Sequence, residues 1–195
     1  MTQRIVHVVE SLEPEAGAVA ISLAGLFNAL SKNGVSSSAI TADGSCGSVR
    51  WAREEKRNHA EARRMIAEAD AVHLHGWGND LARSAGDSAR RAGTPVVISP
   101  LGGLTEGPYR RLPWSARLRH LFSDKALIRY AGVVTALNSV ELSTLEAGKV
   151  HARVVLLPYG IDTREYENAG GMGREEGEAA EAHDEKCLLV LGPIH

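Results

Sequence analysis

Hydrophobic residues gather in short runs along the chain, and longer segments of mixed polarity separate these runs. The runs are rich in Val, Ile and Leu and are continuous rather than alternating, which is typical of strands covered on both faces. They lie at Arg4–Val9, Ser37–Thr41, Ala71–His75, Pro95–Ser99, Gly132–Ala136 and Arg153–Leu157. Alternation of strands and helices predicts an α/β fold, a Rossmann-like, doubly wound parallel sheet.

Several of the intervening segments carry helix signals. Hydrophobic residues recur at helical spacing over Val19–Leu30, and Gly34 follows as a helix stop. Asn58-x-x-Glu61 and Asn138-x-x-Glu141 resemble capping boxes, so one helix is expected to start at Asn58 and another at Asn138. Gly148 is expected to end the second of these helices.

The segment Arg164–Lys186 breaks the pattern. It contains eight acidic and three basic residues and almost no large apolar side chains. Such a segment buries too little surface to offset the entropy cost of ordering, which predicts a flexible linker. An acidic surface helix over Glu175–Glu185 is the alternative. The expected organisation is therefore a sheet domain over residues 1–163, a linker over 164–186, and a strand of a second domain over 187–195.

Composition narrows the class of protein. The 195 residues are 44% hydrophobic, enough for one substantial core. Charge is balanced at 22 basic and 24 acidic residues, so nucleic acid is not an expected partner. Cys46 and Cys187 do not make a disulfide framework. The sequence has no signal-peptide pattern and no apolar run near the roughly 20 residues that span a bilayer. A cytoplasmic protein is expected, at most peripheral on the inner membrane face.

The loop after the first strand is the first candidate site. In doubly wound sheets, ligands bind at the carboxyl ends of strands, where helix N-termini present free N–H groups to anions. A dinucleotide site would need G-x-G-x-x-G here, but Gly17 is the only glycine in Glu10–Ala18. A nicotinamide cofactor is therefore not expected. An ordinary strand–helix turn with one permissive glycine is the alternative.

A pair of histidines marks the second candidate site. On the strand Ala71–His75, His73 and His75 share one face, and His75 falls at the carboxyl end. Histidines at this spacing can bind a metal, but no Cys, Asp or Glu cluster accompanies them, so no metal is expected. The alternative interpretation places His73 in the core and packs Trp77 under a loop.

A basic stretch from Arg110 to Arg129 is a candidate surface for a partner. This stretch contains six basic residues and one acidic residue. It could contact anionic lipid headgroups or a phosphorylated acceptor. Basic and apolar positions are not cleanly divided between two faces, however, so a solvated helix surface is the alternative.

Four segments together resemble one family, the GT-B glycosyltransferases of family 4. Asp70–Trp77 is similar to the family pattern "D-vvHlHg-w", and Pro95–Leu104 is similar to "P-vv-S-P-(His/Arg)-G-x-L". Val154–Asp162 and Cys187–His195 resemble the "viPNGID" and "LLFLGRIHpkKG" segments at the crossover between the two domains. The resemblance covers Arg4–Asp162 and the terminal strand, and it assigns the chain to the acceptor-side half of the fold.

The resemblance implies a retaining, metal-independent hexosyl transfer from a nucleotide-diphosphate sugar to a glycan or lipid-linked acceptor, as in polysaccharide biosynthesis. The nucleotide sugar is a co-substrate, and no cofactor is implied. Gly17 and Ala18 stand where the family has a Gly-Gly pair beside the donor diphosphate. The implied acceptor cleft is lined by His75, Gly76, Trp77, Gly102 and Gly103.

The sequence also departs from the family. Leu101 stands where many relatives have a histidine that contacts the transferred sugar, and leucine cannot donate a hydrogen bond. Pro193 replaces the Arg of "LGRIH", and Tyr159 the Asn of "PNGID". The catalytic residues are therefore unknown. The family's donor-binding residues belong to the second domain, so we expect a truncated chain that is inactive alone. A non-catalytic half that binds a glycan or a partner is the alternative.

Overall fold

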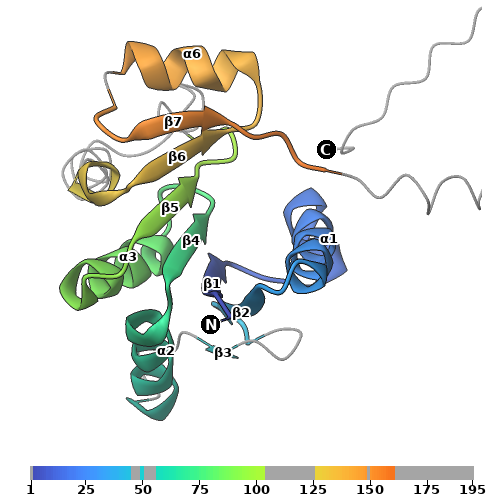
Figure 1. Cartoon of the computed structure of the whole chain (residues 1–195), viewed down its shortest axis with the longest axis vertical. Coiled ribbons are helices and arrows are strands. Elements are labelled where there is room, and N and C mark those ends of the chain that lie inside the picture. Colours follow the sequence, from blue (N-terminus) through green and yellow to red (C-terminus); the bar gives the residue numbers. More distant parts are fainter. Residues whose placement is uncertain (1, 45–48, 51–55, 104–125, 149, 161–195) are drawn as a thin grey trace, which may run out of the picture. The chain divides into compact units, whose positions relative to one another are not determined.

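The protein is an α/β structure built on one parallel sheet (Figure 1). A computed structural model describes residues 2–44, 49–50, 56–103, 126–148 and 150–160. Over these residues, seven strands follow the order β3-β2-β1-β4-β5-β6-β7, and every neighbouring pair is parallel. This confirms the predicted Rossmann-like parallel sheet flanked by helices.

The strands lie close to their predicted positions. They are β1 (Arg4–Val9), β2 (Ser36–Thr41), β3 (Val49–Arg50), β4 (Ala71–His75), β5 (Val96–Ser99), β6 (Val133–Ala136) and β7 (Arg153–Leu156). The short edge strand β3 was not among the predicted strands, because two residues carry no hydrophobic periodicity. Strand order reverses between β1 and β4, since β1 pairs with β2 on one side and with β4 on the other. In open α/β sheets, ligands bind at such a switch point.

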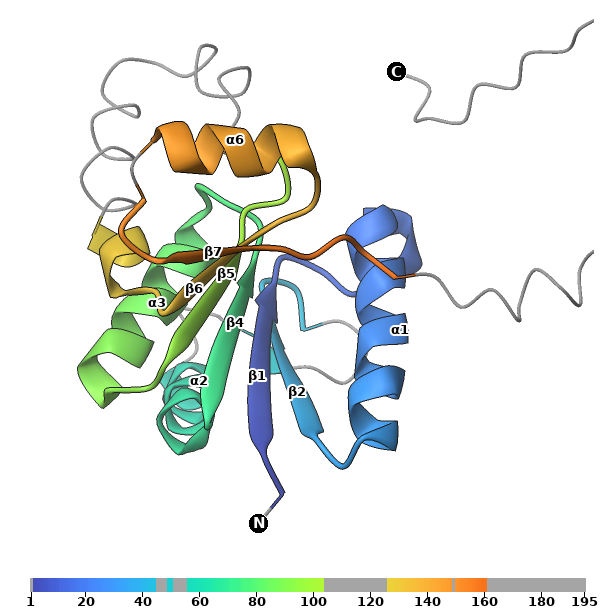
Figure 2. The same ribbon diagram turned by 45° about the horizontal axis from the view of Figure 1, so that its top comes forward.

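The helices cover both faces of the sheet. They are α1 (Ala18–Lys32), α2 (Lys56–Glu68), α3 (Asp80–Ala92) and α6 (Ser139–Ala147), with a 3-10 turn η1 (Pro14–Ala16) before α1, and residues 126–130 are also helical. Figures 1 and 2 show α1 on one side of the sheet and α2 and α3 on the other. The sheet is therefore covered on both sides, as its continuous hydrophobic strands require.

The main core lies between the sheet and the helices α2, α3 and α6. Its strand residues alternate along β1 and β4, so that Val6, Val8, Val72 and Leu74 face this core. The α1 face is different, because it receives the intervening residues of the same strands. His7 of β1 lies there with its ring centroid 4.7 Å from that of Phe27 of α1. Polar groups thus lie beneath α1, between the sheet and the helix.

Helix starts follow the capping signals in part. Asn138 caps α6 as predicted, since its Oδ1 accepts a hydrogen bond from Glu141 N at 2.9 Å. The predicted start at Asn58 is wrong, because α2 already begins at Lys56 and Asn58 lies inside its first turn. Lys and Arg are good helix formers and extend the helix backwards past the Asn. The polar helix α3 was not predicted. Its buried residues recur at helical spacing, but most of them are small, so the buried face is only weakly hydrophobic.

Three predictions lie outside the described residues. They are the linker over 164–186, the strand over 187–195, and most of the basic stretch Arg110–Arg129, of which residues 126–129 are described. Among the helices that the structure describes, none combines the length and the apolar character needed to cross a bilayer.

Candidate functional site

The loops at the carboxyl ends of β1, β4 and β5 are neighbours. All strands are parallel, so the loop that contains Gly17, the loop after His75 and the loop Pro100–Gly103 lie at one edge of the sheet. In Figure 2 the amino end of β1 is at the bottom, and these loops lie above the strands. The sequence-predicted residues of the site therefore lie on loops at the same edge of the sheet, beside the switch point.

Gly17 forms the N-cap of α1. Its φ of +98° lies in a region that glycine enters freely and other residues rarely adopt. No side chain caps this helix N-terminus, and a Cβ built on Gly17 would meet no atom within 4 Å. Ala18 is the first residue of the helix. The open helix N-terminus carries partial positive charge, which suits a phosphate group.

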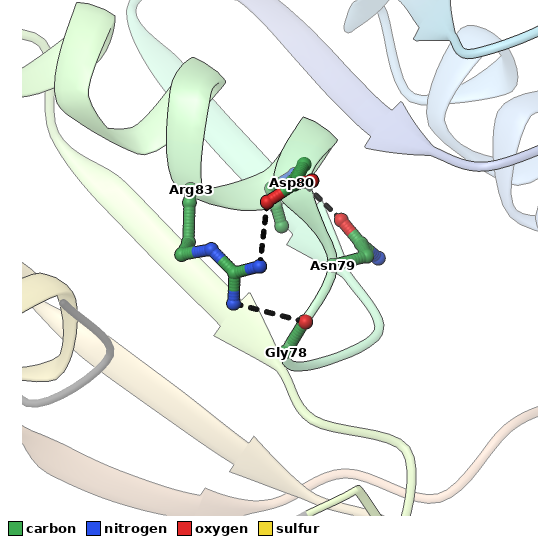
Figure 3. Close-up of polar contacts among 5 residues, drawn as sticks. Gly78, Asn79, Asp80 and Arg83 are labelled. Carbon is green, nitrogen blue, oxygen red and sulfur yellow. Dashed lines mark hydrogen bonds and ion pairs between the residues drawn. The ribbon is translucent and has the colours of Figure 1, made fainter. Parts of the chain in front are cut away.

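The loop between β4 and α3 is held rigidly (Figure 3). Asn79 caps α3, with its Oδ1 accepting a hydrogen bond from Ala82 N at 2.7 Å. The Arg83 guanidinium donates to the Gly78 carbonyl at 2.9 Å and contacts the Asp80 carboxylate at 2.7 Å. At the start of the loop, Gly76 N donates to Ser99 O at 2.9 Å. The backbone on both sides of Trp77 is thus fixed.

Trp77 packs against the loop Pro100–Gly103. A Cβ on Gly103 would lie 2.7 Å from Trp77 Cβ and 2.9 Å from the Pro100 carbonyl oxygen. Any larger residue would displace Trp77 or the backbone. The Trp77 indole Nε1 is buried and has no hydrogen-bond partner within the described part of the chain. This contact agrees with the alternative interpretation, in which Trp77 packs under a loop, and the indole N–H has no acceptor among the described residues.

We expect Gly103→Ala to lower the free energy of unfolding by about 1–3 kcal/mol, because the added methyl group overpacks a site fixed by backbone. The measurement is urea unfolding followed by circular dichroism. Gly25→Ala is the control, since Gly25 lies within α1 and a Cβ there meets nothing within 4 Å. That change should be neutral or stabilising. Equal stability of Gly103→Ala and the parent chain would contradict the close contact with Trp77.

Leu101 adopts a left-handed backbone conformation with φ of +56°. It is the one non-glycine residue at positive φ among the described residues, and such a conformation costs on the order of 1–2 kcal/mol. Gly102 follows with φ of +77°, and a Cβ on it would meet nothing within 4 Å. Strain of this kind persists where the surrounding structure enforces it, often near a functional site.

Glu141 enforces the conformation of this loop. Its side chain is buried, and its Oε1 accepts a hydrogen bond from Gly102 N at 2.7 Å. Its Oε2 accepts a second hydrogen bond from Leu137 N at 2.9 Å. One carboxylate therefore joins the loop after β5 to the loop after β6. The sequence placed Glu141 in a capping box but gave no sign of this second contact.

Tyr159 lies in the segment after β7 and approaches the same group. Its hydroxyl is buried and has no hydrogen-bond partner among the described residues. Burial, together with the negative charge of Glu141, raises the pKa of Tyr159 to about 12. Tyr159 therefore stays a neutral phenol that can donate a hydrogen bond.

Three histidines lie below the loops, on the face of the sheet covered by α1. His7 of β1 is in register with His73 of β4, and His75 lies two residues further along. His7 Nδ1 and His75 Nε2 are 3.0 Å apart. His73 Nε2 is 2.7 Å from Ser99 Oγ, which is itself 2.7 Å from Thr135 Oγ1. His75 is at the predicted edge, but its ring is only 3% exposed and contacts His7.

Burial keeps these imidazoles neutral. Desolvation lowers the pKa of His7 to about 4 and that of His73 to about 3, the latter with a contribution from His7. The pKa of His75 is lowered well below its usual value, again mainly by burial, with repulsion from the other two rings. At neutral pH each ring has one N–H and one lone pair. The third ring, His7, was not part of the site predicted from sequence.

The chain is similar to a known protein family in sequence and to solved structures in fold. A family model described as "Glycosyl transferase 4-like domain" matches residues 33–160. No curated protein matches the chain. One similar solved structure is a short-chain dehydrogenase/reductase (ethylated) from Veillonella parvula DSM 2008, with 11% sequence identity and a TM-score of 0.46, covering 71% of this chain and 70% of that chain.

Proposed function

The chain belongs to the glycosyl transferase 4-like domain family, and on that premise we propose that it supplies the acceptor side of a retaining hexosyl transfer. The donor is a nucleotide-diphosphate sugar, and the acceptor is a glycan or lipid-linked sugar. Family membership by itself establishes only a glycosyltransferase-type domain with a Rossmann-like sheet. The site geometry supports the finer proposal.

The observation that carries the proposal is the position of Trp77. Its indole lies half-buried at the switch point of the sheet, and its buried Nε1 has no hydrogen-bond partner in the described ranges. The exposed part of the indole suits packing against the C–H groups of a sugar, and a turn of the ring would bring the buried Nε1 donor to a hydroxyl oxygen. His75 ends β4 at the same edge of the sheet, and the backbone of Gly76, Gly102 and Gly103 would complete the border of the acceptor cleft.

The donor diphosphate is assigned to the α1 N-terminus. Gly17 and Ala18 stand at its first turn, and the space beside Gly17 is open. A diphosphate there would be stabilised by backbone N–H groups and the helix dipole without a metal ion. This assignment places donor and acceptor on adjacent loops, because β1 and β4 are neighbouring strands.

We expect Trp77→Ala to abolish glycan binding by the chain, since both the packing face and the Nε1 donor are lost. Trp77→Phe should keep part of the affinity, because it removes the donor but keeps a smaller aromatic face. Binding is measured with labelled chain on a glycan array, followed by calorimetry with the best glycan. Calorimetry with uridine, guanosine and adenosine diphosphate sugars on the same chain should show weak binding, because donor contacts belong mainly to the family's second domain.

Tyr130→Ala provides a matched control. Tyr130 is a half-buried aromatic that packs on the same core, but its hydroxyl bonds to the Thr94 carbonyl before β5, at the opposite edge of the sheet. Both variants lose packing in the core, whereas only Trp77→Ala should lose glycan affinity. Unchanged glycan affinity in Trp77→Ala would contradict the acceptor assignment, and micromolar affinity for a nucleotide sugar would contradict the division of donor contacts.

A further inference from the structure

We propose that His7, His73 and His75 form a binding site for one divalent transition-metal ion of the Zn²⁺ type, held between β1 and β4. Imidazole nitrogen is a preferred ligand of Zn²⁺, and sites with three protein ligands leave a fourth position for water. The inference is independent of sugar transfer, and it differs from the metal-free expectation that the sequence and its family resemblance gave.

The first argument is the distance between ligand atoms. One nitrogen from each ring can be chosen so that all three lie within 4.8 Å of one another. His7 Nδ1 and His75 Nε2 are 3.0 Å apart. Two nitrogens on a tetrahedral Zn²⁺ lie about 3.3 Å apart, given Zn–N distances of about 2.05 Å. The third nitrogen, which lies within 4.8 Å of the other two, would reach this separation by rotation about its side-chain torsions.

The second argument is the rigidity of the backbone that carries the rings. His7 and His73 are register partners on adjacent central strands, and His75 follows on the same face of β4. The ring centroids of His73 and His75 are 3.9 Å apart. Phe27 of α1 packs on His7 from above. The three rings are therefore gathered before any ion binds, which reduces the entropy cost of binding.

The third argument is the hydrogen-bond partner of His73. When its Nδ1 holds the ion, its Nε2–H donates to Ser99 Oγ, and the Ser99 hydroxyl donates to Thr135 Oγ1. Histidines that bind a metal are usually held in this way, by a hydrogen bond from the second ring nitrogen. Ser99 and Thr135 are both buried, so this chain of hydroxyls has a fixed position.

The fourth argument is the pair of nitrogens left over. His7 Nε2 and His75 Nδ1 are buried and have no hydrogen-bond partner in the part of the chain that the structure describes. Two unsatisfied polar atoms in one small cluster are costly for side chains that serve only as core packing. A cluster with this cost indicates a role other than core packing. The ion would replace the contact between His7 Nδ1 and His75 Nε2, and it would not bind the two leftover nitrogens.

The test uses the full chain with its affinity tag removed and with metal stripped by EDTA and dialysis. Calorimetry with ZnCl₂ at pH 7.5 should give one site per chain with a Kd of about 1 µM or tighter. CoCl₂ should give the visible absorption of tetrahedral Co²⁺, and an excess of ZnCl₂ should remove it. Thermal unfolding with ZnCl₂ should shift upward, because the ion binds the folded chain alone.

Variants separate the cluster from other histidines. His7→Phe and His75→Phe keep an aromatic ring and should weaken Zn²⁺ binding by at least roughly 100-fold, whereas Ser99→Ala should weaken it by about 10-fold. His151→Ala, which removes an exposed histidine before β7, should leave binding unchanged. Circular dichroism checks the fold of each variant. If a ring variant fails to fold, the binding of one Zn²⁺ per parent chain still tests the proposal.

Three results would overturn the proposal. The first is absence of a 1:1 complex with Zn²⁺ in the parent chain. The second is undiminished binding in folded His7→Phe and His75→Phe. The third is an equal loss of affinity in His151→Ala. Because every readout is metal binding or stability, failure here leaves the sugar-transfer proposal standing, and a failed glycan experiment leaves the metal site standing.

Discussion

Replacing Glu141 by alanine is expected to lower the free energy of unfolding by about 2–4 kcal/mol, one of the two largest effects that the structure predicts. The carboxylate accepts hydrogen bonds from Gly102 N and Leu137 N, and each bond to a charged group contributes about 1.5–3 kcal/mol. Gly102 and Leu137 are only half-buried, so water replaces part of what is lost. The expected value is therefore below the full sum of the two bonds.

The measurement is urea unfolding of Glu141→Ala and Glu141→Gln beside the parent chain. Glutamine keeps one acceptor oxygen but turns an amide N–H₂ toward a backbone N–H, so it should also destabilise, by more than about 1 kcal/mol. Glu146→Ala is the matched control, because Glu146 is exposed on the same helix. Its effect should stay within about 0.5 kcal/mol. Equal effects of Glu141→Ala and Glu146→Ala would show that the carboxylate does not join the two loops.

Loss of Glu141 should also release the loop Pro100–Gly103. Leu101 holds an unfavourable backbone conformation, and the anchor on Gly102 N is the hydrogen bond that keeps its neighbour in place. Without that anchor, Leu101 is free to relax. The proposed border of the acceptor cleft therefore depends on a residue of α6 that does not line the cleft itself.

Most of the sheet could be predicted from the sequence, because its strands are short and mostly hydrophobic. β1 and β4 have the predicted bounds. β1 ends where the charged Glu10 follows Val9, and β4 begins after the charged Asp70. The limits of α2 and the existence of α3 could not be predicted in the same way. In α3, small residues such as Ala85 and Gly86 form the buried face, and small residues give a weak hydrophobic signal.

The edge of the sheet that carries the site could also be predicted, because parallel strands must end on one side. What the sequence could not give was the contacts between distant segments. His7 and His75 are 68 positions apart and meet only because β1 and β4 are neighbours. Glu141 and Gly102 are 39 positions apart. The roles of Gly17 and Ala18 in donor binding, and of the cleft residues in acceptor binding, stay predictions.

The metal-free chain is expected to lose stability steeply as the pH falls below about 6.5, the second of the two large effects. Burial lowers the pKa of His7 to about 4 and of His73 to about 3, and lowers that of His75 well below its usual value. In the unfolded chain all three titrate near 6.5. Between pH 6.5 and 5 the unfolded chain therefore binds protons that the folded chain excludes, and protonation favours unfolding.

The slope follows from the number of rings. Each histidine that stays neutral only when folded lowers the free energy of unfolding by about 1.4 kcal/mol per pH unit, so three rings give up to roughly 4 kcal/mol per unit. Urea unfolding in EDTA at pH 7.5, 6.5, 5.5 and 5.0 measures it. Above pH 7 the histidines contribute no slope, because both states are neutral. His75→Phe should reduce the slope by about 1.4 kcal/mol per unit. A free energy of unfolding that is constant from pH 7.5 to 5.0 would mean that the three rings accept protons in the folded chain. It would contradict the burial of these rings beneath α1.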